Sequence, residues 1–170
     1  VGHQGTSAET FSYTIDWDDG VVESGQVTGI TDGAAGLVLM SVEEAERRGL
    51  EPLATVGESA QAGVDPRRMG IGPIPAVEAL AKKNGIAPAD YDLVELNEAF
   101  AAQVIACQRE LNFPEDRLNV NGGAIALGHP IGATGARIVV TLVHEMARRG
   151  AVNGLATLCI SGGMGLACAF

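Results

Sequence analysis

The 170-residue sequence has few positive charges, few aromatic residues and few cysteines. Its 11 Lys and Arg residues are outnumbered by 21 Asp and Glu residues, which gives a formal net charge of -10. That balance disfavours attraction to nucleic acid or to an anionic membrane surface. The sequence also lacks a run of about 18 apolar, uncharged residues, so we expect no membrane-spanning helix.

The three cysteines are not placed with histidine at the spacing of a zinc site. So few cysteines argue against a disulfide-rich secreted scaffold and favour a reduced intracellular protein, which we expect in the cytoplasm. The first residues lack a basic segment followed by an apolar one, so we expect no signal peptide. We expect no metal site either.

The remaining composition is that of one globular domain, with 46% hydrophobic residues and 23 glycines. Residues 1–25 are polar, acidic and rich in Gly and Ser, and we interpret them as an irregular N-terminal arm or strand pair. Residues 26–170 are expected to form the domain, which is long enough to bury a core.

Apolar runs and helix signals alternate from residue 33 onward. The helix predicted over 41–49, for example, begins with Ser41 and Glu44 at capping-box spacing and ends at Gly49. Short apolar runs predict strands, and apolar positions at helical spacing predict helices. The predicted strands are 33–41, 52–56, 91–97, 154–161 and 165–170, the last two as a terminal pair, and the predicted helices are 41–49, 75–85, 98–111 and 133–150.

This order of elements predicts an α/β fold. We expect a mixed, mainly parallel sheet of about five strands, covered by helices on both faces. In such sheets ligands bind at the carboxyl ends of the strands. Three residues of interest lie at such ends or in glycine-rich sequence: Asn97, His129 and Cys159.

Asn97 lies where a strand is predicted to end and a helix to begin. It can serve as the N-cap of that helix, since asparagine is among the best caps. Alternatively, its amide points into a cleft and orients a water or a carbonyl oxygen. The next residue, Glu98, either favours the helix start through the helix dipole or fixes the asparagine.

His129 stands between Gly128 and Pro130 in a glycine-rich run over 119–138. A lone histidine is more often structural than catalytic, but the glycines let the backbone approach a ligand or another strand closely. The helix that follows offers a positive partial charge at its N-terminus. The run lacks the lysine of a P-loop and the spacing of a dinucleotide site, which argues against a phosphate-binding loop.

Cys159 ends an apolar strand and precedes a glycine-rich turn. A buried cysteine is by default a small hydrophobic residue. The turn also offers the peptide N–H groups of Ser161, Gly162 and Gly163 to an oxyanion. A thiol beside a neutral histidine can exchange protons near neutral pH, so an acid/base role is the alternative.

Three stretches occur together and in order: NEAFA at 97–101, NVNGGAIALGHPIGATGAR at 119–137 and CISGGMG at 159–165. In this combination they are highly specific, and the sequence over about residues 27–168 resembles the carboxyl-terminal half of a thiolase. The resemblance implies acyl exchange between coenzyme A thioesters, by Claisen condensation or by cleavage of a 3-ketoacyl-CoA. Coenzyme A thioesters are then substrates, and no separate cofactor is implied.

The resemblance also implies roles for individual residues. His129 would activate a nucleophilic cysteine and, with Asn97 and a water that it holds, stabilise the enolate oxygen. Cys159 would move the α-proton, and the peptide N–H of Ser161 would contribute to a second oxyanion site. The residues expected at the bound substrate are Phe100, which would line the acyl pocket, Glu98, Gly128 and Gly162.

One part of the thiolase pattern is missing. The nucleophilic cysteine and the CoA-binding loop of thiolases lie in the amino-terminal half, and Cys107 and Cys168 stand in a predicted helix and strand where we expect core residues. We therefore expect a split, hetero-oligomeric thiolase, such as a heterotetramer, in which a partner chain supplies both. The subunit would be inactive alone and would bury more than about 2,000 Å² against its partner. A fragment of a full-length thiolase and a non-catalytic acyl-CoA-binding or interaction module are the alternatives.

Overall fold

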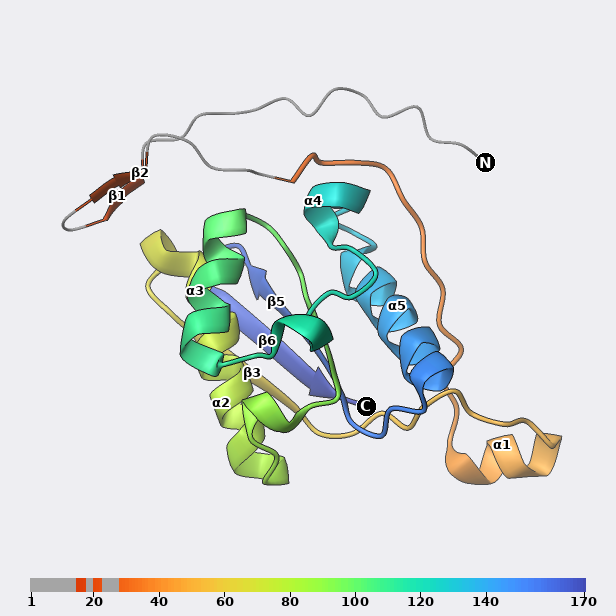
Figure 1. The fold of residues 1–170 in the computed structure, drawn as a ribbon. Helices are drawn as coiled ribbons and strands as arrows, with labels where there is room; N and C mark the ends of the chain where they lie inside the picture. The colour runs from red at the N-terminus through yellow and green to blue at the C-terminus, as the bar shows by residue number, and fades with distance from the viewer. Residues whose placement is uncertain (1–14, 18–19, 23–27) are drawn as a thin grey trace.

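A four-stranded sheet forms the centre of this computed structural model, which describes residues 15–17, 20–22 and 28–170 (Figure 1). The sheet order is β3 (Ser59–Gly63), β6 (Met164–Ala169), β5 (Gly154–Ile160) and β4 (Leu93–Leu96). The β4–β5 pair is parallel, whereas the β5–β6 and β6–β3 pairs are antiparallel. The α/β class and the mixed sheet are confirmed, but the sheet has four strands instead of about five, and most of its pairs are antiparallel.

Helices cover the two faces of the sheet. On one face α2 (Pro73–Asn84) buries Val77 and Leu80 in a cluster with strand residues such as Leu155. On the other face α5 (Thr134–Arg149) buries Ile138 and Leu142 against the strands. Helix α3 (Ala101–Leu111) lies beside α2 (Figure 1). The short elements are η1 (Pro66–Ile71), η2 (Pro88–Asp90), η3 (Glu115–Arg117) and α4 (Ala124–Leu127).

The helices predicted from capping and periodicity are confirmed. In α1 (Val42–Arg48) the Ser41 hydroxyl accepts a hydrogen bond from the Glu44 N–H, and Gly49 ends the helix in the left-handed conformation. Gly85 and Gly150 end α2 and α5 in the same way. The helix predicted from residue 98 begins later, at Ala101. The predicted terminal strand pair is also present, as β5 and β6.

Two strand predictions are wrong. Residues 33–41 and 52–56 contain no strand, and the edge strand β3 lies at 59–63 instead. Their apolar side chains face solvent, with Val38 86% exposed and Leu39 74% exposed. An apolar run becomes a strand only where another strand offers hydrogen bonds, and the described residues provide none beside these two runs. The segment from residue 28 instead passes α4 and α5 in extended form to reach α1 (Figure 1).

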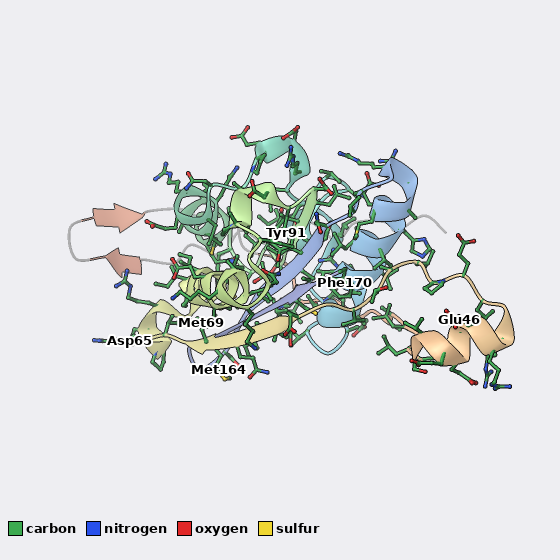
Figure 2. All side chains as sticks on the ribbon, turned by 90° about the horizontal axis from the view of Figure 1, so that it is seen from below. Glu46, Asp65, Met69, Tyr91, Met164 and Phe170 are labelled. Carbon is green, nitrogen blue, oxygen red and sulfur yellow. The ribbon has the colours of Figure 1, made fainter. Side chains whose placement is uncertain are left out.

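Helix α1 lies to one side of the layered body. Figure 2 shows Glu46, on α1, far from Tyr91, which lies among the packed helices and strands. A second, small sheet pairs β1 (Ile15–Trp17) with β2 (Gly20–Val22) in antiparallel register. Most of the predicted 1–25 arm lies outside the described residues. Within the part that the structure describes, no helix is long and apolar enough to cross a membrane.

Candidate active site

Asn97 and Cys159 lie at the same end of the sheet, where the parallel strands β4 and β5 have their carboxyl ends. The parallel register pairs Leu96 of β4 with Thr157 of β5, and the Asn97 N–H donates to the Thr157 carbonyl oxygen at 3.0 Å. Cys159 follows two residues later along β5. Because the carboxyl ends of parallel strands point the same way, the residues that leave β4 and β5 emerge side by side.

The segment 28–31 ties the loop of His129 to the loop that follows β4. Thr28 donates from its N–H and its hydroxyl to the Ala99 carbonyl oxygen, at 3.5 and 3.3 Å. One residue further on, the His129 N–H donates to the Gly29 carbonyl oxygen at 3.0 Å, and the Thr31 N–H donates to the His129 carbonyl oxygen at 3.4 Å. The segment thus joins the loop of His129 to the loop that follows Asn97, and Asn97 is itself hydrogen-bonded to β5, the strand that carries Cys159.

Glu98 provides a second tie between the loop after β4 and the glycine-rich run. One carboxylate oxygen accepts from the Ile125 N–H at 3.0 Å, and the other accepts from the Asn119 side-chain amide at 3.1 Å. An ideal Cβ on Gly123 would lie 2.0 Å from the Glu98 carboxyl carbon, so glycine is required for this close approach. These contacts show that Glu98 anchors the two loops to each other. Its expected contact with substrate stays a prediction.

The N-cap interpretation of Asn97 is wrong. Helix α3 begins at Ala101, after a bend at Ala99, with Phe100 at the N-cap position in extended conformation. Asn97 is instead buried, with 1% of its surface exposed. Its side-chain oxygen is buried without a hydrogen-bond partner among the described residues. Buried polar atoms normally have a partner, so this oxygen is a candidate acceptor for a water or a ligand group.

His129 is partly buried directly before α5. Its Nδ1 atom lies 2.7 Å from the hydroxyl oxygen of Thr134, the first residue of that helix. Burial lowers the pKa of the imidazole, and the nearby positive charge of Arg137 lowers it further. A neutral imidazole is therefore the dominant form near neutral pH, and it can accept a proton.

Cys159 is partly buried at the end of β5. Burial raises the pKa of its thiol, so the protonated form dominates near neutral pH. The turn that follows is tight, with Gly162 and Gly163 at φ values of +87° and +86°. The Gly163 carbonyl oxygen accepts from the Val64 N–H at 2.7 Å, which anchors the turn to the chain before η1. Ser161 and Gly162 are exposed at its tip.

Cys107 and Cys168 are poorly suited to nucleophilic catalysis. Cys107 is fully buried in α3, and burial raises the pKa of its thiol to about 12. Cys168 is partly buried in β6, and burial raises its pKa as well. Both environments disfavour the thiolate that acts as a nucleophile. The expectation that Cys107 is a core residue is confirmed.

The structure also places the remaining predicted substrate residues. Gly128 adopts a φ of +94°, and an ideal Cβ there would lie 2.6 Å from the Thr31 side chain. Its conformation and its packing against the segment 28–31 therefore account for the glycine. Phe100 is partly buried at the start of α3. Contact of Gly128, Gly162 and Phe100 with a substrate stays a prediction.

The sequence did not identify two residues that organise the site, Asn119 and Thr134. Asn119 has a φ of +46°, and its side chain accepts from the Leu96 N–H and donates to the Leu96 carbonyl oxygen, both at 2.9 Å. An asparagine three residues before a glycine pair, in a run without helical periodicity, was the available signal for a left-handed position. Thr134 had a weaker signal, a threonine four residues after a proline at a helix start.

The arrangement combines a neutral imidazole, a protonated thiol, an unpartnered amide oxygen and an exposed glycine turn at one sheet edge. These groups can exchange protons and stabilise a developing oxyanion. Among the described residues no group of His, Cys, Asp and Glu side chains is placed to hold a metal ion. Fold and site together define an α/β protein with a candidate acid/base site at the carboxyl ends of its parallel strands.

Comparison with known proteins identifies the family. The family model described as "Thiolase, C-terminal domain" matches residues 50–170. The chain is 56% identical over 151 residues to an acetyl-CoA acetyltransferase of Chromobacterium violaceum, a match that covers 89% of the chain and 38% of that relative. A crystal structure of the Bacillus anthracis acetyl-CoA acetyltransferase matches with a TM-score of 0.83 and 51% identity, over 85% of this chain and 36% of that one. The chain belongs to the thiolase family.

The matches also bound how much of a thiolase is present. An acetyl-CoA acetyltransferase of Thiocystis violacea is 53% identical over 167 residues, which is 97% of this chain and 42% of the relative. That match extends the resemblance beyond residues 27–168 to include most of residues 1–25. The chain spans about two fifths of the length of the curated relatives it matches.

Proposed function

We propose that this chain supplies the acid/base half of an active site that exchanges acyl groups between coenzyme A thioesters. The observation that carries the proposal is the shared sheet edge: Asn97 and Cys159 emerge from neighbouring parallel strands, and the segment 28–31 ties the loop of His129 to the same place. The similarity to proteins named acetyl-CoA acetyltransferases supports the choice of reaction.

The reaction in the cleavage direction has two half-reactions. His129 takes the proton of a nucleophilic cysteine, and the resulting thiolate attacks the keto carbon of a 3-ketoacyl-CoA. The carbon–carbon bond breaks, its electron pair forms the enolate of the shortened thioester, and Cys159 gives its proton to the enolate carbon. Cys159, now a thiolate, takes the proton of the thiol of free coenzyme A, whose sulfur attacks the acyl-cysteine. The carbon–sulfur bond to the cysteine breaks, and the cysteine leaves with the proton that His129 holds. Condensation is the reverse sequence.

The protonation states of the unliganded site suit these roles. The lowered pKa of His129 keeps the imidazole neutral and able to take a proton, and the raised pKa of Cys159 keeps a proton on the sulfur. The unpartnered oxygen of Asn97 would accept a hydrogen bond from a water, whose other proton faces the enolate oxygen. Each such oxyanion donor contributes about 10²- to 10³-fold to kcat in enzymes where it has been removed.

The nucleophile comes from sequence outside these 170 residues, since Cys107 and Cys168 are unsuited to the task. The split-thiolase hypothesis places it on a separate partner chain in a hetero-oligomer, and the fragment hypothesis places it on the same polypeptide. The exposed apolar side chains over 37–56 support either hypothesis, because both provide further protein that can cover them. The masses of the polypeptides in the native complex distinguish the two.

The direct test is reconstitution. The chain is combined with the amino-terminal part of an acetyl-CoA acetyltransferase relative, and the loss of acetoacetyl-CoA is followed after free coenzyme A is added. We expect activity that falls by about 10²- to 10⁴-fold in the His129→Ala and Cys159→Ala variants, the range for positioned acid/base groups. Cys168→Ala is the matched control, and it should retain activity.

Two outcomes would contradict the proposal. Activity that survives in His129→Ala or Cys159→Ala assemblies would refute the assigned roles. An assembly that binds acetoacetyl-CoA but never converts it, although its amino-terminal part carries the nucleophile, would favour the non-catalytic binding module.

A further inference from the structure

Thr134 holds His129 through a chain of two hydrogen bonds. The Thr134 hydroxyl oxygen lies 2.7 Å from Nδ1 of His129 and 2.9 Å from the Pro130 carbonyl oxygen. Thr134 is 1% exposed, so bulk water does not compete for its hydroxyl group. The contacts are local, because all three residues lie at the start of α5 or in the turn before it.

The number of available protons fixes the direction of both hydrogen bonds. A hydroxyl group has one proton, and a carbonyl oxygen has none. The Thr134 hydroxyl must therefore donate to Pro130, since otherwise two oxygen atoms 2.9 Å apart would face each other without a proton between them. The remaining contact then requires Nδ1–H of His129 as donor and the hydroxyl oxygen as acceptor. A neutral imidazole with its proton on Nδ1 has a free lone pair on Nε2.

We infer that Thr134 is a positioning residue that sets the tautomer of His129, with the proton on Nδ1 and Nε2 as the basic atom. This inference rests on the proposed function for its catalytic consequence but not for the tautomer itself. Without the threonine, no described contact fixes the proton on Nδ1. The wrong tautomer presents an N–H to the nucleophile, and it cannot take the proton of a thiol.

The tautomer can be measured without any assay of activity. The chain is produced with ¹⁵N-labelled histidine and combined with the unlabelled amino-terminal part, and long-range proton–nitrogen correlations are recorded above the titration range of the imidazole. His129→Gln identifies the signals of His129 among those of the three histidines. We expect a protonated nitrogen at Nδ1 and an unprotonated nitrogen at Nε2. Wild-type signals that show the proton on Nε2 would overturn the inference, whatever the behaviour of any variant.

Variants then test whether Thr134 is the cause. Thr134→Val keeps the shape but removes the hydroxyl, and we expect it to move His129 toward the Nε2–H tautomer. Thr134→Ser should restore the wild-type pattern. Thr141→Val is the matched control, since Thr141 makes the same kind of hydrogen bond to the Arg137 carbonyl oxygen in α5, away from His129. A Thr134→Val spectrum identical to wild type would overturn the inference, and Thr134→Ala, which also lacks the hydroxyl, keeps the test decisive if the valine variant does not fold.

The assembled enzyme gives a second readout. In the reconstituted enzyme, Thr134→Val should lower kcat by about 10- to 100-fold, the range found when the hydrogen-bond partner of a metal-bound histidine is removed, and KM should change little. Thr134→Ser should recover most of kcat. A valine variant with full kcat would overturn the inference. The predicted tautomer in an assembly without acyl transfer would instead refute the proposed function and leave the positioning role established.

Discussion

Gly123 determines how closely the glycine-rich run approaches the loop after β4. An added Cβ would lie 2.0 Å from the Glu98 carboxyl carbon, and Glu98 cannot move without losing its hydrogen bonds to Asn119 and Ile125. We expect Gly123→Ala to lower the free energy of unfolding in urea by about 1–3 kcal/mol, the usual cost of overpacking. The loss should be accompanied by reduced activity in the assembled enzyme.

A second glycine in the same run serves as the control. Gly135 lies in α5, and nothing lies within 4 Å of its ideal Cβ. Gly135→Ala should leave the free energy of unfolding unchanged or raise it by up to about 1 kcal/mol, because alanine favours the helix. Equal stabilities of the two variants would show that Glu98 adapts to the added methyl group.

The carboxyl group of Glu145 accounts for part of the expected loss of stability in acid. Hydrogen bonds from Arg148, Asn121 and Arg149 lower the pKa of this carboxyl to about 2, from an ordinary value of 4.5. Between these values the folded state binds fewer protons than the unfolded state. The stabilisation is therefore complete above about pH 4.5 and is lost as the pH falls toward 2.

Glu145→Gln tests this assignment. The variant should be less stable than wild type near neutral pH, and the difference between their urea midpoints should shrink as the pH is lowered toward 2. The exposed Glu46→Gln variant controls for the loss of one negative charge, and its difference from wild type should not follow that pattern. A constant difference between Glu145→Gln and wild type across the acid range would exclude Glu145 as the source.

At the scale of elements, Asn119 protects the open edge of β4. Its backbone N–H donates to the Val94 carbonyl oxygen, and its side chain bonds both polar groups of the Leu96 backbone. Asn119 thus gives hydrogen-bond partners to the exposed backbone groups of β4, as an additional strand would. We expect Asn119→Ala to lower the free energy of unfolding by about 1–3 kcal/mol, because it leaves backbone groups of β4 without partners.

Asn112 is the matched control for that variant. It has a similar left-handed conformation, with a φ of 54° against 46° for Asn119, but its side chain is exposed at the end of α3. Its side-chain amide makes one long, exposed hydrogen bond, 3.5 Å from the Glu110 carbonyl oxygen, so Asn112→Ala measures chiefly the conformational cost. Urea unfolding measures the free energy of both variants. An equal loss in the two would show that the Leu96 hydrogen bonds contribute nothing.

The helices could be predicted from sequence because their signals are local. Each helix start or end depends on a residue next to it in the sequence: Ser41 begins α1, Gly49 ends it, and Gly85 ends α2. The sequence around each residue therefore contains the necessary information. The runs 33–41 and 52–56 were misassigned because an apolar run indicates burial without naming a partner. The predominance of antiparallel strand pairs was also missed, since the pairing of β3 with β6 joins segments about 100 residues apart in the chain.

The site divides in the same way. Asn97, His129 and Cys159 could be identified because each stands at a strand end or in a glycine-rich stretch, and the thiolase resemblance joined them. The contacts that hold them could not be predicted, because Glu98 with Asn119 and Thr28 with Ala99 depend on how separate loops meet. Their roles in catalysis stay predictions that reconstitution tests.

At the scale of the whole molecule, the segment 37–56 gives the chain an apolar surface that needs a cover. Its exposed side chains include Val38 and Leu39. We expect the chain to self-associate when it is expressed alone, and the double variant Val38→Asp, Leu39→Asp to weaken both self-association and assembly. Burial of one such side chain contributes about 1.5–3 kcal/mol, so the dissociation constant should rise at least about tenfold.

Sedimentation velocity at several concentrations measures this effect. Val152→Asp is the control, since Val152 is a single apolar residue that is 75% exposed outside the segment. It should associate like the wild type. Unchanged association in the double variant would show that another surface makes the contact.

The β4–β5 pairing has a consequence for the order in which the protein folds. β5 and β6 are joined by a turn of three residues, whereas α3, α4 and α5 all lie between β4 and β5. Short loops close faster and at lower entropic cost than long ones, so the hairpin that carries Cys159 can form early. Asn97 reaches that hairpin only when the long crossover closes. The two residues that the proposed chemistry needs side by side therefore meet late in folding.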